Sequence, residues 1–175
     1  MPSLAKSLRI AVLGALVAAM WACSSPRQAP DFSFTTYQGE DVLGGSELKL
    51  SQLQGRPLVL NFWAGLCPPC RDEMPAFQEM YARDKERVLL LGIDVGPFVG
   101  LGTRDDGMMM LQDMLITYPT ASTEDSSIIA RYEVVAMPST FFITPDGRII
   151  RKWSGPIGQE LPELVDELVK ESVKR

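Results

Sequence analysis

The sequence contains no histidine among its 175 residues. This absence excludes catalysis by a Ser-His-Asp triad or a Cys-His pair, zinc sites built from imidazole ligands, and pH switches that depend on histidine. Basic residues are also few, because 17 Lys and Arg stand against 22 Asp and Glu and the net charge is −5 at pH 7. Binding to a nucleic-acid backbone needs clustered Lys and Arg, so we expect a protein or small-molecule partner and no nucleic acid.

Cysteine is scarce as well, with three residues in the whole chain. Cys67 and Cys70 form a CxxC pair, whereas Cys23 stands alone. Neither a histidine nor a second CxxC pair is present to complete a structural zinc site, which would need acidic ligands or a second chain. We therefore expect no metal and no cofactor. A purely structural disulfide between Cys67 and Cys70 would close a two-residue loop and stabilise the fold little, which favours a redox role.

The N-terminal region lacks a hydrophobic run of the roughly 20 residues that span a bilayer. Its apolar stretch from Ile10 to Ala22 is shorter and follows Lys6 and Arg9. This arrangement is typical of the apolar region of a signal peptide, so we predict a signal peptide over residues 1–22.

The end of this stretch, Met20-Trp21-Ala22-Cys23, resembles the lipobox of bacterial lipoproteins. The resemblance implies that Cys23 becomes the lipidated first residue of the mature chain. The Ser-, Pro- and Gln-containing residues that follow predict a tether over 23–30 and a folded domain over 31–175. The signal peptide and the lipidated cysteine together predict that this domain lies outside the cytoplasm and is anchored to the membrane. An uncleaved anchor or ordinary secretion would also place the domain outside the cytoplasm.

Two short apolar runs in the remaining chain predict buried strands: Leu58–Trp63 and Val88–Ile93. Between them, Met74, Phe77 and Tyr81 recur at the spacing of one helix face. A strand, a helix and a strand of these lengths form a βαβ unit, in which the two strands are parallel.

The C-terminal part predicts an antiparallel hairpin and a helix. Residues 139–143 and 148–153 flank the turn signature Pro145-Asp146-Gly147, so the sheet is mixed. An apolar stripe then predicts a helix that covers one sheet face: Leu161, Leu164, Val165, Leu168 and Val169. The sequence shows no internal repeat and no second linker, so we predict one α/β domain.

Residues 96–127 are harder to interpret. The pattern predicts a loop over 96–102 and a helix over 104–117, and residues 96–107 carry no chemical signature from which a role can be predicted. Four methionines lie on the predicted helix: Met108, Met109, Met110 and Met114. Such a cluster could bind a soft metal such as copper(I) or form an adaptable binding surface, but packing in the core is the commoner use and is our expectation.

The CxxC pair directly follows a predicted strand and opens a predicted helix, which is the context of a redox motif. The unpaired N–H groups and positive dipole at a helix N-terminus favour a thiolate, so we expect a lowered pKa for Cys67. Pro68 and Pro69 fit the first turn because the N–H groups they lack would be unpaired there. We expect the Cys67 thiolate to depend on the dipole and on the N–H and S–H groups of Cys70.

Six motifs are present between Ala29 and the C-terminal region: Ala29-Pro30-Asp31-Phe32, Leu50-Ser51-Gln52-Leu53-Gln54-Gly55-Arg56-Pro57, Asn61-Phe62-Trp63-Ala64, Cys67-Pro68-Pro69-Cys70, Glu73-Met74-Pro75 and Met137-Pro138-Ser139-Thr140-Phe141. Together they resemble the thioredoxin superfamily, and within it the membrane-tethered, extracytoplasmic thiol-disulfide oxidoreductases of the TlpA and ResA type, which are related to the AhpC/TSA redoxins. The resemblance implies a thioredoxin-like fold, with a mixed central sheet flanked by helices on both faces. The chain departs from the family pattern at Gly65-Leu66, since such proteins usually carry Trp before the first cysteine.

The resemblance implies a role for each residue of the site. An exposed Cys67 attacks a substrate disulfide, and Cys70 then attacks Cys67, which leaves a Cys67–Cys70 disulfide. Glu73 tunes the cysteines or accepts their protons, although it could instead be a first-turn acid that complements the helix dipole. A cis-Pro138 beside the cysteines exposes the backbone of Met137 to pair with the substrate.

Further expectations concern the substrate and the direction of electron flow. Trp63 and Leu66 are expected to contact the substrate beside the CxxC pair. The resemblance implies reduction of protein disulfides, for example in apocytochromes c during cytochrome c biogenesis, with electrons from a membrane thiol protein. One alternative is a peroxiredoxin-like peroxidase, which needs Thr or Ser where this chain has Ala64. The other is a redox-inert binding or metal-chaperone lipoprotein.

Overall fold

The two apolar runs predicted as strands lie at the centre of the computed structural model, which describes residues 27–174. β3 (Leu58–Trp63) and β4 (Leu89–Asp94) are buried over their whole length and run parallel. α3 (Pro68–Asp84) connects them. The predicted βαβ unit is therefore confirmed, and it brings the end of β3 to the start of α3.

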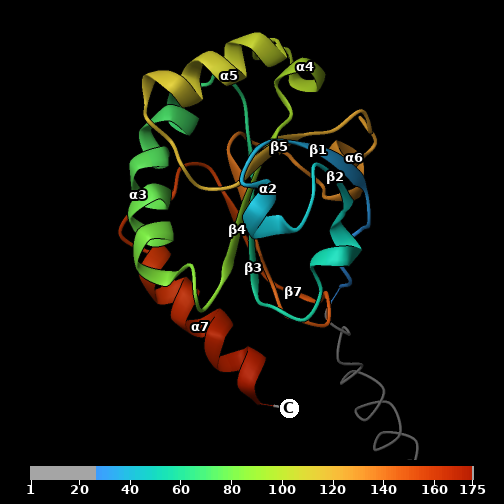
Figure 1. The fold of residues 1–175 in the computed structure, drawn as a ribbon, viewed down its shortest axis with the longest axis vertical. Coiled ribbons are helices and arrows are strands. Elements are labelled where there is room, and N and C mark those ends of the chain that lie inside the picture. Colours follow the sequence, from blue (N-terminus) through green and yellow to red (C-terminus); the bar gives the residue numbers. More distant parts are fainter. Residues whose placement is uncertain (1–26, 175) are drawn as a thin grey trace, which may run out of the picture.

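Five further strands complete a mixed sheet in the order β2-β1-β5-β4-β3-β6-β7 (Figure 1). β6 (Ser139–Ile143) is antiparallel to β3 and forms the predicted hairpin with β7 (Ile149–Ser154). β5 (Thr120–Ser122) is parallel to β4, and the sheet continues antiparallel through β1 (Ser33–Gln38) to β2 (Glu47–Lys49). The sequence pattern did not predict these last three strands.

Helices cover both faces of the sheet, which confirms the predicted fold class (Figure 1). α3, α7 (Leu161–Val173) and part of α5 (Arg104–Asp113) pack on one face. The opposite face is covered by shorter elements: α2 (Glu40–Leu43), η2 (Leu50–Leu53) and α6 (Ile128–Arg131). No helix within residues 27–174 combines the length and the apolar character needed to cross a membrane.

Alternate residues of β3 enter two separate cores. Val59 and Trp63 pack in the core beneath α3, and we call this side of the sheet the α3 face. Leu60 and Phe62 pack in the other core, in which an aromatic cluster has ring centroids 5.0 to 6.3 Å apart: Phe32, Phe62, Tyr132 and Phe141. We call this side the aromatic face.

The first described residues pair with the turn between β6 and β7. Gln28 forms a bridge with Arg148, and the Ala29 N–H donates a hydrogen bond to the Gly147 carbonyl at 2.8 Å. The domain therefore includes residues 27–30, which the prediction assigned to a tether over 23–30, because their backbone groups complete the hydrogen bonding of this turn. Cys23 and the predicted signal peptide lie outside the described residues.

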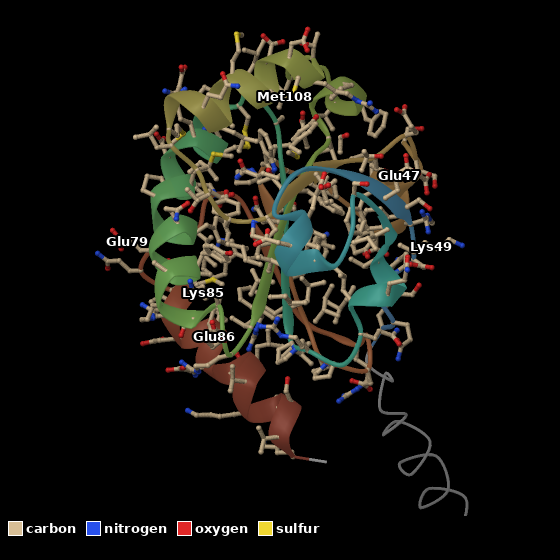
Figure 2. The ribbon with its side chains drawn as sticks, viewed as in Figure 1. Glu47, Lys49, Glu79, Lys85, Glu86 and Met108 are labelled. Atoms are coloured by element: carbon tan, nitrogen blue, oxygen red, sulfur yellow. A yellow bond between two sulfur atoms is a disulfide. The ribbon has the colours of Figure 1, made fainter. Side chains whose placement is uncertain are left out.

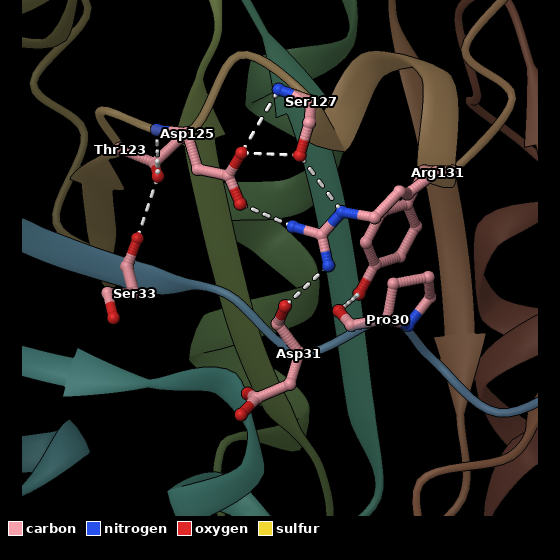
Figure 3. A network of polar contacts seen from close by, with 8 residues as sticks. Pro30, Asp31, Ser33, Thr123, Asp125, Ser127 and Arg131 are labelled. Atoms are coloured by element: carbon pink, nitrogen blue, oxygen red, sulfur yellow. Dashed lines mark hydrogen bonds and ion pairs between the residues drawn. The ribbon is translucent and has the colours of Figure 1, made fainter.

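The next residues of the N-terminal segment are held by α6 and the residues that flank it (Figure 3). The Arg131 guanidinium donates to the Asp31 carbonyl at 2.7 Å and pairs with the Asp125 carboxylate. The Tyr132 hydroxyl donates to the Pro30 carbonyl at 2.8 Å. These contacts fix the start of the domain against the aromatic face.

Residues 96–113 differ most from the prediction. α4 (Gly96–Val99) is a short helix where a loop was expected, and α5 ends at Asp113. Met110 is buried, but Met108 and Met109 are 39% and 55% exposed. The expected core packing is wrong for these two, because α5 lies at one end of the molecule with one side toward the core (Figure 2).

Candidate active site

The CxxC pair lies at the N-terminus of α3, as predicted. Cys67 is the residue before the first helical turn, and Pro68 and Pro69 occupy the first two helical positions. A disulfide joins Cys67 to Cys70, whose Cα atoms are 5.2 Å apart. The Cys70 N–H donates a hydrogen bond to the Cys67 sulfur at 3.3 Å. This donor and the positive end of the helix dipole would both stabilise a Cys67 thiolate in the reduced protein.

Cys67 is less accessible than predicted. Cys67 is 3% exposed and Cys70 is fully buried, so the expectation of an exposed Cys67 is wrong for the disulfide form. The physical reason is that both residues pack in the core of the α3 face. Leu66, directly before Cys67, is 60% exposed, and its contact with substrate stays a prediction.

Glu73 is buried on the same helix, three residues after Cys70. Its Oε1 accepts a hydrogen bond from Asn61 Nδ2 at 2.8 Å, and its Oε2 accepts one from the Ile157 N–H at 3.0 Å. Burial raises the pKa of Glu73 from 4.5 to about 8, against the opposing effect of these two hydrogen bonds. The alternative of a first-turn acid that complements the helix dipole is wrong, because Glu73 lies beyond the first turn of α3 and is buried. The carboxyl can hold or release a proton near neutral pH.

The Met137–Pro138 peptide bond is cis, as the resemblance implies. The Pro138 carbonyl accepts a hydrogen bond from the Gly155 N–H at 2.8 Å, two residues before Ile157 contacts Glu73. The segment after β7 therefore connects Pro138 with the buried carboxyl. Met137 is half-buried, and its pairing with substrate stays a prediction.

Trp63 does not form part of an accessible surface. It is fully buried in the core of the α3 face, and its ring lies close to Gly92 and Gly107. A substrate cannot contact this side chain in the disulfide form, so the predicted role of Trp63 in substrate binding is corrected.

Three residues that contribute to the site were not predicted. Asn61 and Ile157 hold the Glu73 carboxyl, and the Thr140 hydroxyl oxygen accepts a second hydrogen bond from Asn61 Nδ2 at 3.1 Å. Asn61 carried a signal, because it is a polar residue within the apolar run of β3. Ile157 acts through its backbone, which leaves no trace in the sequence. No group of three or more Cys, Asp or Glu side chains within residues 27–174 is arranged to hold a metal ion.

The chain is similar to known thiol-disulfide oxidoreductases. Thiol-disulfide oxidoreductase ResA of Oceanobacillus iheyensis is 33% identical over 126 residues, which cover 69% of this chain and 60% of that relative. The protein of the same name from Bacillus subtilis is 25% identical over 165 residues, which cover 94% of this chain and 86% of the relative.

A solved structure shows the same fold. The crystal structure of a thiol:disulfide interchange protein DsbE from Chlorobium tepidum matches with a TM-score of 0.70 and 23% identity, over 82% of this chain and 96% of that one. The model of the AhpC/TSA family matches residues 26–152. Since this match spans more than half of the sequence, the chain belongs to the AhpC/TSA family.

Proposed function

We propose that the chain is a thiol-disulfide oxidoreductase that reduces disulfide bonds of protein substrates outside the cytoplasm. The observation that carries the proposal is the Cys67–Cys70 disulfide at the N-terminus of α3, with the buried Glu73 carboxyl on the same helix. The similarity to thiol-disulfide oxidoreductases supports this enzyme class.

The reaction starts from the reduced pair. The Cys67 thiolate attacks a substrate disulfide, one sulfur–sulfur bond breaks as another forms, and the first substrate sulfur leaves as a thiolate that takes a proton. Cys70 then loses its proton to water, or to the minor fraction of Glu73 that is ionised below its raised pKa, and attacks the Cys67 sulfur. The second substrate thiolate leaves, so two electrons pass to the substrate and the pair ends as the disulfide.

The partners that we propose follow from this chemistry. The substrate is a protein disulfide that must be opened, such as that of an apocytochrome c, whose haem-attachment cysteines must be free thiols. A membrane thiol protein returns two electrons to the Cys67–Cys70 disulfide. We further propose that lipidated Cys23 anchors the domain to the outer side of the membrane, which the lipobox-like residues before it support.

A trapping experiment tests the proposal. Cys70→Ala removes the resolving sulfur, so the mixed disulfide between Cys67 and its substrate should accumulate in cells that express the full chain. Cys67→Ala is the matched control and should capture nothing. Covalent adducts that disappear on reduction, form with Cys70→Ala and are absent from the control are the expected result. Equal recovery from both variants, or none from either, would contradict the exchange mechanism.

A peroxide assay separates the proposal from peroxidase activity within the same family. Ala64 stands three residues before Cys67, where a peroxidase of this type needs a hydroxyl side chain. We therefore expect hydrogen peroxide to oxidise the reduced chain no faster than it oxidises an ordinary free thiol. Rapid, saturable consumption of peroxide would assign the pair to peroxide reduction instead.

A further inference from the structure

A chain of hydrogen bonds links the end of β4 to the residue before Cys67. Asp94 Oδ1 accepts from the Gly96 N–H at 2.9 Å, and the Gly96 carbonyl accepts from the Leu101 N–H at 3.0 Å. The Leu101 carbonyl then accepts from the Leu66 N–H at 2.8 Å. The geometry points to Asp94 as a positioning residue for the loop that carries Cys67. Residues 96–101 connect the Asp94 carboxylate to this loop through their backbone hydrogen bonds.

The Asp94 carboxylate is itself firmly placed. It is 1% exposed, and its Oδ2 accepts a hydrogen bond from the Tyr37 hydroxyl of β1 at 3.1 Å. The charged groups that face it are Arg104 and Asp106 of α5. Burial raises the pKa of Asp94, although the hydrogen bonds from Gly96 and Tyr37 and the positive charge of Arg104 oppose this shift. A buried carboxylate with a hydrogen-bond donor on each oxygen has a fixed position, so it can hold the loop that donates to it.

Two glycines let α5 pack with its backbone against both the loop and the carboxylate. A Cβ atom at Gly65 would lie 2.4 Å from the Gly107 nitrogen and 2.5 Å from the Asp106 carbonyl carbon. A Cβ atom at Gly107 would lie 2.4 Å from Asp94 Oδ2. A side chain at Gly65 would therefore require a shift of the α5 backbone, and one at Gly107 would require a shift of the Asp94 carboxylate. This close packing explains why glycine stands at position 65.

The consequence concerns the Cys67 thiolate. Its stabilisation depends on the position of the sulfur relative to the first turn of α3, and the helix-terminus effect falls off within that turn. A loop released from Leu101 would leave the sulfur less well aligned with the Cys70 N–H. This inference rests on the proposed exchange function, in which Cys67 acts as the thiolate.

Two substitutions of Asp94 test the inference in the full chain. Asp94→Asn keeps an oxygen that can accept the hydrogen bond from Gly96, and Asp94→Ala removes it. The measurement is the pH dependence of Cys67 alkylation in the reduced protein, with each cysteine resolved by peptide mass spectrometry. We expect Asp94→Ala to raise the pKa of Cys67 by about half a unit, which lowers the thiolate fraction at neutral pH about threefold. Asp94→Asn should retain the wild-type profile.

Asp84→Ala is the matched control, because Asp84 is equally buried but pairs with Arg83 and Arg87 at the far end of α3. It should lower stability and leave the alkylation profile unchanged. A shift of equal size with Asp94→Asn would show that charge acts rather than the hold on Gly96, and it would overturn the inference, as would an unchanged profile with a folded Asp94→Ala.

Hydrogen exchange of the Leu66 amide in the wild-type chain decides the matter even if the alanine variant does not fold. The inference requires this amide to be protected, and fast exchange would overturn it. The proposed function fails separately, if wild-type Cys67 shows no lowered pKa and no reversible exchange with thiols.

Discussion

The two faces of the sheet are made by alternate residues of the same strands, yet they differ in what they bury. On the aromatic face, Tyr132 packs among phenylalanine rings and its hydroxyl has a partner in the Pro30 carbonyl. On the α3 face, four buried polar atoms have no hydrogen-bond partner within residues 27–174: Asn61 Oδ1, Trp63 Nε1, the Tyr118 hydroxyl and Thr120 Oγ1. Unpaired buried groups cost stability, and they occur here on the side that also holds the disulfide and Glu73. The aromatic face therefore contributes mainly to stability, whereas the α3 face is less fully hydrogen-bonded where the reactive groups lie.

Loss of the reactive sulfur on the α3 face should have the largest effect on activity. Cys67→Ser removes the nucleophile, so the rate of disulfide reduction should fall on the order of a thousandfold or more. The measurement is turnover of a protein disulfide by the prereduced full chain. An activity within about tenfold of wild type would contradict the assignment of Cys67.

Phe62→Ala disrupts the packing of the aromatic face instead. Phe62 is fully buried among three other rings, so its truncation should lower the free energy of unfolding by about 3–5 kcal/mol. Urea unfolding of the oxidised chain measures this change. In the fraction that stays folded, the reduction potential of the cysteine pair should match wild type, and a changed potential would show that the two faces are not separable.

Glu73→Gln tests the buried carboxyl of the α3 face through the pH dependence of stability. The folded protein keeps Glu73 protonated up to about pH 8, whereas the unfolded chain loses that proton near pH 4.5. Between these values the folded state binds more protons, so stability falls as pH rises, by about 3 kcal/mol from pH 5 to pH 8.

The glutamine variant should lack this loss, and its stability relative to wild type should therefore grow with pH. Urea unfolding at pH 5, 6.5 and 8 checks the trend. A difference between the two proteins that stays constant with pH would show that the pKa of Glu73 is not raised.

The smallest effect compares one hydroxyl on each face. Tyr132→Phe deletes a paired hydroxyl and leaves the Pro30 carbonyl without its donor, so it should cost about 1 kcal/mol of stability. Tyr118→Phe deletes a buried hydroxyl with no partner in the described part of the chain, so it should be neutral or stabilising. Denaturant unfolding measures both, and an equal loss would erase the proposed difference.

The central fold could be predicted because its elements carry strong local patterns. β3 and β4 are buried on both sides and therefore appear as unbroken apolar runs, and the Pro68-Pro69 pair marks the start of α3. β2 and β5 have three residues each, too few for a period to appear.

The cysteine pair of the site was predictable, but its environment was not. The CxxC spacing before a predicted helix indicated a redox pair, and the family resemblance implied that Glu73 acts with it. The burial of the sulfurs and the raised pKa of Glu73 depend on packing and on contacts from distant segments, such as the Ile157 N–H. The link from Asp94 to Leu66 runs through backbone groups, which no pattern of side chains reveals.

The reduction potential of the Cys67–Cys70 pair shows whether the chain is a reductant. The full chain would be equilibrated in graded dithiol buffers, and the fraction of reduced pair read by thiol alkylation. We expect a reversible couple below about −220 mV, as for a reductant in an oxidising compartment. A couple above about −150 mV would make the protein an oxidant or isomerase, and the absence of a reversible couple would contradict a redox role for the α3 face.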